Sequence, residues 1–238
     1  MERVPLEAPE RVFDLGCGTG EATRLISDRW PRADIVGLDS SPEMLARAAA
    51  EPGRVRWQRA DVGDWRPDAP ADLLYSNAAL HWVEGHEILF PALLGRLRAG
   101  GCLAVQMPLS WDLPSHRLMR ETLADARPGG GPLGSSALRH AAERRWVEAP
   151  RVYYDLLSGR ARSLDVWTTE YLQVLEGADP VLGWVEGSGL RPILQGLEPE
   201  ARARFRAEYA RRLRIAYPAG SDGRTVYPFR RLFVVATV

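Results

Sequence analysis

One stretch near the N-terminus constrains the fold more than any other, because it joins an apolar run to a glycine-rich turn and a predicted helix. Residues 12–15 read as a buried strand and residues 21–30 as a helix, with Gly16, Gly18 and Gly20 between them. Alternating glycines let the backbone bend sharply and let a ligand approach where a Cβ atom would block it. The stretch therefore predicts the first strand–turn–helix unit of an α/β fold, with a ligand at the turn.

A second short strand, residues 33–39, follows the helix and ends on an acid, Asp39. This carboxylate lies about 20 residues past the last glycine, which is the spacing of the acid that holds a ribose in a nucleotide-type βαβ unit. Asp39 is therefore the candidate acceptor for a ribose diol.

The chemistry around the turn separates three candidate explanations. A dinucleotide site would have the spacing G-x-G-x-x-G with a helix N-terminus aimed at a pyrophosphate. Here the spacing is G-x-G-x-G, and Asp14 and Glu21 flank the glycines. Acids suit a cationic ligand better than a phosphate, and S-adenosylmethionine (AdoMet) is such a ligand, with an amino acid, a sulfonium, a ribose and an adenine. NAD and purely structural glycines are the alternatives.

Strands and helices alternate through the first half of the chain. Strands are predicted at 12–15, 33–39, 54–60, 72–77 and 102–107, and helices at 21–30, 42–50 and 86–99. Ser41 before Pro42 is a typical helix start. Strands separated by helices of this length indicate a parallel sheet, whose ligand binds at the carboxyl ends of the strands.

The pattern changes after Pro108. Helices are predicted at 115–126, 136–148, 180–189, 191–196 and 198–215, and strands at 163–172 and 232–236. The Gly/Pro-rich residues 128–132 follow no strand, so we interpret them as a surface loop and not as a phosphate loop. We expect an AdoMet-binding core over 1–108, a helical cap over 109–162 and the C-terminal part of the fold over 163–238, together one structural domain with the cap over the strand ends.

Composition narrows the class of protein. The 238 residues include 31 basic and 31 acidic side chains, and all 31 basic residues are Arg. The net charge is therefore zero, without the excess of positive charge that is typical of nucleic-acid binding. Cys17 and Cys102, both in predicted buried positions, indicate a reducing compartment without disulfides and no metal site. The N-terminus has no signal-peptide pattern, and no apolar run approaches the ~20 residues of a membrane span. We expect a soluble, cytoplasmic protein.

Residues 14–20, Asp39, Asp61–Val62 and 77–82 together resemble the class I AdoMet-dependent methyltransferases. A closer resemblance, to the trans-aconitate 2-methyltransferase family, runs nearly end to end and is carried by residues 40–44, 103–108, 118–121, 153–157, 165–169, 189–192 and 231–236. It implies a Rossmann-like fold with a mostly parallel seven-stranded sheet, helices on both faces and a helical cap.

The resemblance and the residue chemistry together give the candidate site. The residues expected to bind AdoMet are Asp14, Gly16, Cys17, Gly18, Gly20, Asp39, Ser40, Asp61, Val62, Asn77 and Ala78. His81 and Trp82 are expected beside the methyl group as an orienting donor and an apolar wall, with core packing as the alternative. Donors for substrate carboxylates would be Tyr153, Tyr154, Arg191, Arg230 and Arg231, although each Arg is alternatively a solvated surface charge.

The resemblance implies methylation of one carboxylate of a small polycarboxylate, trans-aconitate, with S-adenosylhomocysteine as the second product. Such a carboxylate is already ionised at neutral pH, so the reaction needs no general base. One alternative is a methyltransferase for another small molecule, such as a quinone or a natural product. Another is an AdoMet-binding relative with impaired catalysis, since family members carry a segment before the position of Arg3 that closes over AdoMet. We expect no nucleic-acid or membrane partner and favour a monomer.

Overall fold

The computed structural model describes residues 2–125, 130–187 and 189–238, which form two compact units. The first unit comprises Met1–Pro108, Trp146–Thr169 and Arg231–Val238, and the second comprises Leu109–Arg145 and Glu170–Arg230. The predicted boundary at Pro108 coincides with a unit boundary. Residues 146–162, which the sequence analysis assigns to the cap, lie instead in the first unit with the strands.

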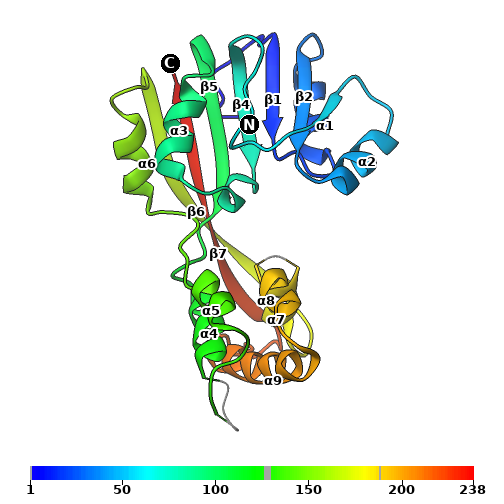
Figure 1. Cartoon of the computed structure of the whole chain (residues 1–238), viewed down its shortest axis with the longest axis vertical. Helices are drawn as coiled ribbons and strands as arrows, with labels where there is room; N and C mark the ends of the chain where they lie inside the picture. The colour runs from blue at the N-terminus through cyan, green and yellow to red at the C-terminus, as the bar shows by residue number, and fades with distance from the viewer. Residues whose placement is uncertain (1, 126–129, 188) are drawn as a thin grey trace. The chain divides into compact units, whose positions relative to one another are not determined.

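A seven-stranded sheet organises the first unit, with the strand order β3-β2-β1-β4-β5-β7-β6. Its strands are β1 (Arg11–Leu15), β2 (Asp34–Asp39), β3 (Arg56–Arg59), β4 (Ala71–Asn77), β5 (Leu97–Pro108), β6 (Ser163–Leu175) and β7 (Thr225–Thr237). Figure 1 shows β5, β4, β1 and β2 side by side. The pairs β3–β2, β2–β1, β1–β4 and β4–β5 are parallel and β5–β7 is antiparallel, which confirms the predicted mostly parallel sheet.

The direction of winding reverses between β1 and β4, because the chain builds outward from β1 to β3 and then returns to pair β4 with the other edge of β1. In open α/β sheets, the carboxyl ends of the strands at this reversal form the ligand crevice. The central strands are buried on both faces, as parallel strands covered by helices are. Val12, Ile35, Leu73 and Cys102 share one hydrophobic cluster with Ile26 of the first helix.

The helices follow the predicted order, except that the helix at 150–157 and the 3₁₀ turn at 80–82 were not predicted. They are α1 (Glu21–Arg29), α2 (Pro42–Ala50), α3 (His86–Leu94), α4 (Pro114–Ala124), α5 (Ser136–Ala142), α6 (Pro150–Leu157), α7 (Pro180–Glu186), α8 (Arg191–Gln195) and α9 (Pro199–Ala216), with a 3₁₀ turn, η1, at Leu80–Trp82. Ser41 caps α2, since its Oγ accepts a hydrogen bond from the Met44 amide at 3.2 Å. None of the helices in the described ranges is long and apolar enough to cross a bilayer.

Two predicted helix ends are wrong. The helix expected over 86–99 ends at Leu94, and β5 already begins at Leu97, where it pairs with Ala71 of β4. Strand pairing therefore outweighs the helical preference of residues 95–99, as tertiary context commonly does. The helix expected over 136–148 ends at Ala142, and the separate helix α6 begins at Pro150, a residue suited to a first helical turn.

Parts of three further predictions fall outside the described residues. These parts are Ala126, expected to end the helix that begins at 115, the first residues of the loop predicted over 128–132, and Ser188 in the helix predicted over 180–189. The described remainder of that loop, 130–132, is exposed.

The second unit has its own core, built by α4, α7, α8 and α9 with the first half of β7. Its centre contains the fully buried rings of Phe205, Tyr209 and Tyr227. Two tyrosine hydroxyls bond the backbone of Ser115 at the start of α4: Tyr209 donates to the carbonyl at 2.8 Å, and Tyr217 accepts from the amide at 3.0 Å. The described part of this unit therefore packs around its own apolar and aromatic cluster.

Asp72 at the start of β4 provides a test of the sheet. Its buried carboxylate accepts from the amides of Glu10 (3.1 Å) and Arg11 (2.7 Å) and also from the Arg98 guanidinium. We expect Asp72→Ala to lower the free energy of unfolding by about 3 kcal/mol, because two main-chain donors and a cation lose their acceptor. Urea denaturation measures this change.

Asp34→Ala is the matched control, because Asp34 also pairs with an arginine, Arg56, but both side chains are exposed. Its cost should stay below about 1 kcal/mol. Equal losses for the two variants would contradict the structural role given to Asp72.

Candidate active site

The turn after β1 is fastened to the end of β2 by main-chain and side-chain hydrogen bonds. The amides of Gly16 and Cys17 both donate to the Leu38 carbonyl at 2.8 Å. The next amide of the turn, that of Gly18, donates to Asp39 Oδ2 at 2.9 Å. The glycine turn and the acid predicted to act with it therefore form one connected unit at the carboxyl ends of two neighbouring strands.

Two glycines of the turn have conformations that other residues rarely adopt. Gly16 has φ 75°, and a Cβ atom there would lie 2.2 Å from the Cβ of Ala79 in the loop after β4. Gly18 has φ 56°, and a Cβ atom there would meet nothing within 4 Å. Gly16 is thus required for packing between two loops, whereas Gly18 leaves an open backbone surface of the kind that admits a ligand.

Asp39 is half-buried and fixed by two main-chain donors. Its Oδ1 accepts from the Ser41 amide at 2.9 Å, and its Oδ2 accepts from Gly18. A carboxylate oxygen has two lone-pair sites, so each oxygen retains capacity for one more donor. A rigid carboxylate with spare acceptor capacity suits the two hydroxyls of a ribose. Ser40, beside it, is exposed.

Asp14 lies behind the turn and is almost completely buried, with 1% of its surface exposed. Burial raises the pKa of its carboxyl to about 7, the hydrogen bond from Thr23 opposes this shift, and the nearby Asp39 carboxylate adds to it. The Thr23 hydroxyl donates to Oδ2 at 2.5 Å. A carboxyl whose pKa lies near 7 is partly protonated at neutral pH and becomes fully charged when a cation binds beside it. The charge of Asp14 therefore suits the ammonium group of an amino acid.

Cys17 lies in the same turn and is buried. Burial, with smaller contributions from Asp14 and Asp39, raises the pKa of its thiol to about 12. The sulfur therefore stays protonated at neutral pH and is no nucleophile.

The loops after β3 and β4 complete the strand ends. Asp61 is exposed, and its Oδ1 accepts from the Gly63 amide at 2.8 Å, which is a turn-capping contact. Val62 beside it is buried. After β4 comes Ala78, whose φ of 53° is positive, and whose amide donates to the Gln106 carbonyl at 2.9 Å. A strained backbone held by its neighbours is typical of ligand sites, and Ala78 directly follows the predicted Asn77.

His81 and Trp82 lie in η1, just beyond this strained residue, with ring centroids 4.7 Å apart. Burial lowers the pKa of His81 to about 4, so the ring is neutral at physiological pH. Its Nδ1 is buried and has no hydrogen-bond partner within the described parts of the chain. Trp82 is 51% exposed. An exposed indole and an unsatisfied imidazole nitrogen are unusual for core residues and favour the functional interpretation.

The predicted substrate residues are divided between the two units. In the first unit, Tyr153 is fully buried, and its hydroxyl bonds His86 at 2.7 Å, so its expected contact with a substrate is corrected to a structural one. Tyr154 is 46% exposed, and Arg231 donates to the side chain of Gln106 at 3.3 Å.

The other two predicted substrate residues belong to the second unit. Arg230 pairs with Glu170 at 2.6 Å, and Arg191, the first residue of α8, is exposed. Both arginine side chains are exposed in the second unit.

The sequence analysis did not identify two residues near the site. Thr23 faces Asp14 from the first turn of α1, and Gln106 is a buried polar residue near the end of the apolar strand β5. Gln106 carried a usable signal, because a polar side chain in a predicted central strand requires a partner. Thr23 carried none, because its role depends on how α1 folds back over β1.

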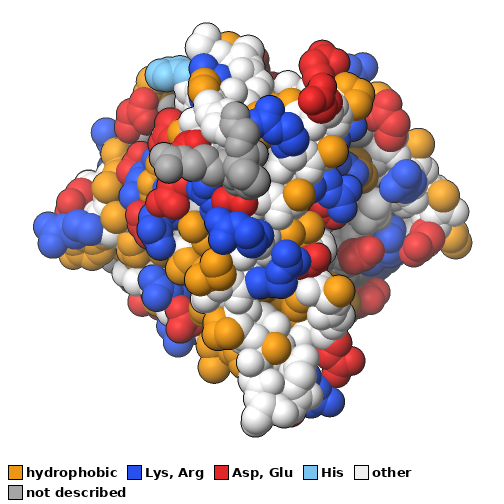
Figure 2. All heavy atoms as spheres, turned by 90° about the horizontal axis from the view of Figure 1, so that it is seen from below, with side chains coloured by type: hydrophobic (Ala, Val, Ile, Leu, Met, Phe, Trp, Pro, Cys, Tyr) orange, Lys and Arg blue, Asp and Glu red, His pale blue; other side chains and the backbone are white. Residues whose placement is uncertain are grey.

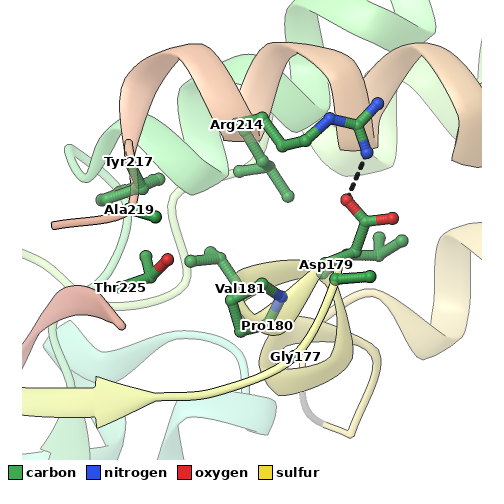
Figure 3. Close-up of a pocket in the computed structure, with 11 residues that line it drawn as sticks. Gly177, Asp179, Pro180, Val181, Arg214, Tyr217, Ala219 and Thr225 are labelled. Carbon is green, nitrogen blue, oxygen red and sulfur yellow. Dashed lines mark hydrogen bonds and ion pairs between the residues drawn. The ribbon is translucent and has the colours of Figure 1, made fainter. Parts of the chain in front are cut away.

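A separate pocket lies in the second unit between the end of β6, α7 and the C-terminal end of α9 (Figure 3). Val181, Tyr217 and other mainly apolar residues line it, and the ion pair of Arg214 with Asp179 borders it. None of the predicted site residues is among those that line it. The molecular face in Figure 2 shows arginine and acidic side chains interspersed, in keeping with the balanced composition.

Comparison with known proteins identifies the family. The family described as "Methyltransferase domain" matches residues 12–101, which contain the glycine turn and the ends of β1 to β4. Among solved structures, the chain resembles a phosphoethanolamine N-methyltransferase of Haemonchus contortus in complex with S-adenosyl-L-methionine, with a TM-score of 0.54, 15% identity, and 98% of this chain and 50% of that one covered. It also resembles the YcgJ protein of Bacillus subtilis, with a TM-score of 0.55, 15% identity, and 99% and 94% covered. These likenesses concern the fold.

Sequence relatives are much closer. The chain is 49% identical to a trans-aconitate 2-methyltransferase of Pseudomonas paraeruginosa over 238 residues, which covers 100% of this chain and 86% of that protein. It is also 49% identical to a protein of the same name from Streptomyces avermitilis over 234 residues, covering 96% and 85%. Identity at this level extends over both units, including the second-half stretches that carry the resemblance in the sequence. The chain therefore belongs to the trans-aconitate 2-methyltransferase family.

Proposed function

We propose that the protein transfers a methyl group from AdoMet to one carboxylate of a small polycarboxylate, trans-aconitate by its family, forming a monomethyl ester and S-adenosylhomocysteine. The observation that carries the proposal is the pair of carboxylates beside the glycine turn, Asp14 in β1 and Asp39 at the end of β2. Asp39 is fixed beside the open backbone of Gly18, and the buried Asp14 lies behind it. Two acids at a strand-to-helix turn suit a cationic methyl donor and oppose a pyrophosphate.

The chain offers a distinct group to each part of AdoMet. Asp39 would accept from the ribose diol, and Asp14 would face the ammonium of the methionyl end. The backbone of the turn from Gly16 to Gly20, with Cys17 and Ser40, would border the ligand. Asp61 and Val62 would meet the adenine, and Asn77 and Ala78 the amino-acid end. When bound, AdoMet supplies a methyl group activated by a positively charged sulfur.

The chain's own residues position the substrate and exclude water. A substrate carboxylate is ionised near neutral pH, so no residue needs to take a proton from it. Aligning the nucleophilic oxygen and removing its water account for the catalysis required. We assign the alignment to His81, whose neutral ring has a buried nitrogen without a partner in the described parts of the chain, and the apolar wall to the exposed indole of Trp82.

The remaining substrate carboxylates require donors, and forked arginine hydrogen bonds suit them. We propose Tyr154, Arg191, Arg230 and Arg231 for this role, since three of them lie in stretches characteristic of the family and Arg230 directly precedes one of these stretches. Tyr153 is excluded because its hydroxyl is buried and occupied.

We also propose that the protein acts as a monomer in the cytoplasm on a small molecule, without a nucleic-acid or membrane partner. The two buried free cysteines and the balanced charge support this proposal.

Incubation of the purified protein with AdoMet and a panel of polycarboxylates, followed by mass spectrometry, tests the reaction. We expect a mass increase of one methylene on trans-aconitate and equimolar S-adenosylhomocysteine. Quinones and natural-product carboxylic acids in the same panel examine other substrates. Methylation of one of these while trans-aconitate stays unchanged would contradict the assigned substrate but not the assigned cofactor.

The packing role of Gly16 predicts a loss of AdoMet affinity on substitution. Gly16→Ala should weaken AdoMet binding by at least about 10-fold, because the new Cβ displaces Ala79 and the loop that carries Asn77 and Ala78. Isothermal titration calorimetry measures the affinity. Gly53→Ala is the matched control, because nothing lies within 4 Å of a Cβ atom there, and its affinity should be that of the wild type.

The raised pKa of Asp14, about 7, predicts that AdoMet binding releases a proton. Near pH 6 the carboxyl is mainly protonated, and a neighbouring ammonium favours the carboxylate. Binding should therefore release up to about one proton, and this release should fade as the pH rises above 7. Calorimetry in buffers of different ionisation enthalpy measures it. Asp14→Asn should bind more weakly and release no proton, and a wild type without buffer dependence would refute the assignment.

A further inference from the structure

A buried hydrogen-bond chain lies directly behind η1, the turn that bears His81 and Trp82. His86, the first residue of α3, bonds the Leu80 carbonyl through Nε2 at 2.9 Å and the Tyr153 hydroxyl through Nδ1 at 2.7 Å. The same hydroxyl accepts from the Glu148 amide at 3.1 Å. His86 is 5% exposed, and Tyr153 of α6 is fully buried. The network thus joins two segments that are far apart in the sequence, 80–86 and 148–153.

Only one arrangement of protons satisfies every member of this chain with a neutral histidine. The Leu80 carbonyl can only accept, so Nε2 of His86 carries the ring proton. Nδ1 is then an acceptor, and Tyr153 donates its hydroxyl proton to it. The tyrosine oxygen accepts in turn from the Glu148 amide. Each donor has one acceptor and the direction is fixed, which makes the network stiff in a buried environment.

Packing supports the same geometry. The ring of Phe90, one turn along α3, lies with its centroid 5.1 Å from that of His86 and 4.8 Å from that of Tyr153. The three rings hold each other at aromatic contact distance and exclude water from the hydrogen bonds.

η1 itself has few internal constraints. It spans three residues, and its Leu80 carbonyl also accepts a hydrogen bond from the Val83 amide at 3.0 Å. Short 3₁₀ turns have poor hydrogen-bond geometry and little stability of their own. His81 adds no anchor, because its Nδ1 is without a partner in the described residues. The direction of the His81 ring therefore depends on how the Leu80 carbonyl is held.

We propose that His86 and Tyr153 are positioning residues for methyl transfer: through the Leu80 carbonyl they fix the turn that presents His81 and Trp82 to the substrate. The inference rests on the proposed function and deepens it, because neither residue touches the substrate in this assignment. It also explains why the stretch 153–157 is characteristic of the family although Tyr153 is inaccessible to a ligand.

Protonation of His86 would disturb the arrangement, since Nδ1 would then carry a proton and Tyr153 would lose its acceptor. Burial lowers the pKa of His86, while the Leu80 hydrogen bond, Glu87 of the same helix and Glu148 beside Tyr153 raise it. His81 of η1, itself neutral at physiological pH, is near enough for a charge on His86 to lower its pKa. The net effect places the pKa of His86 below the ordinary histidine value, so the ring is neutral at neutral pH and is protonated only as the pH falls through this lowered pKa.

The test combines Tyr153→Phe with a matched control, Tyr209→Phe, which removes another buried hydroxyl, the one that donates to the Ser115 carbonyl in the second unit. We expect Tyr153→Phe to lower kcat about 10-fold with an unchanged KM for AdoMet, because one hydrogen bond is lost while the cofactor site is intact. The acid limb of the kcat profile should move to higher pH, since neutral His86 loses its donor. Tyr209→Phe should lower Tm to a similar extent and leave kcat and its pH profile unchanged.

A second readout does not depend on activity. The chain has only four histidines, so the ring nitrogens can be resolved by NMR of the ¹⁵N-histidine-labelled protein. In the wild type, His86 should show the Nε2–H tautomer, and in Tyr153→Phe both the His86 and the His81 signals should shift. Should Tyr153→Phe not fold, His86→Gln is measured in the same way. Wild-type kcat, pH profile and His81 signals in the folded variant would overturn the proposal, whereas a wild type inactive on every panel acid would overturn only the proposed function.

Discussion

The hydrogen bond from the Gly18 amide to the Asp39 carboxylate is the contact on which the site depends. It joins the turn after β1 to the end of β2, and the Leu38 carbonyl, which accepts from two amides of the same turn, strengthens the connection. A carboxylate that already accepts two main-chain hydrogen bonds needs no reorganisation when a ligand arrives. The turn can adopt this shape only because glycine tolerates the positive φ at positions 16 and 18.

The same arrangement decides which ligand the turn can accept. A helix N-terminus by itself attracts anions, and in a dinucleotide site nothing counters that preference. Here Asp39 is close enough to Asp14 to contribute to its raised pKa, so a second negative charge in the site is unfavourable until a cation is present. The turn is therefore electrostatically prepared for a positively charged ligand. The neutral His81 and the exposed Trp82, at the adjoining strand end, add no charge that would oppose a substrate anion.

Much of this could be predicted from the sequence because the relevant signals are local. The glycine spacing, Asp39 at the end of a strand and Ser41 before Pro42 each act within a few residues of their own position. The end of α3 could not be predicted in this way, because residues 97–99 become strand only through their pairing with β4. Tyr153 was misjudged for a similar reason: an aromatic hydroxyl in a family-specific stretch suggests a ligand contact, and only the fold shows that His86 occupies it.

The sequence by itself determined the order of strands and helices, the AdoMet-type turn and the family, because these follow from residue types at short, fixed spacings. Only the tertiary structure decided which acid is buried with a pKa near 7, which glycine a neighbouring loop requires, and which histidine nitrogen has no partner among the residues that the structure describes. These properties depend on desolvation and on contacts between segments that are distant in the chain. Burial shifts the pKa of a carboxyl or an imidazole, and the buried surroundings exist only after the strands have paired.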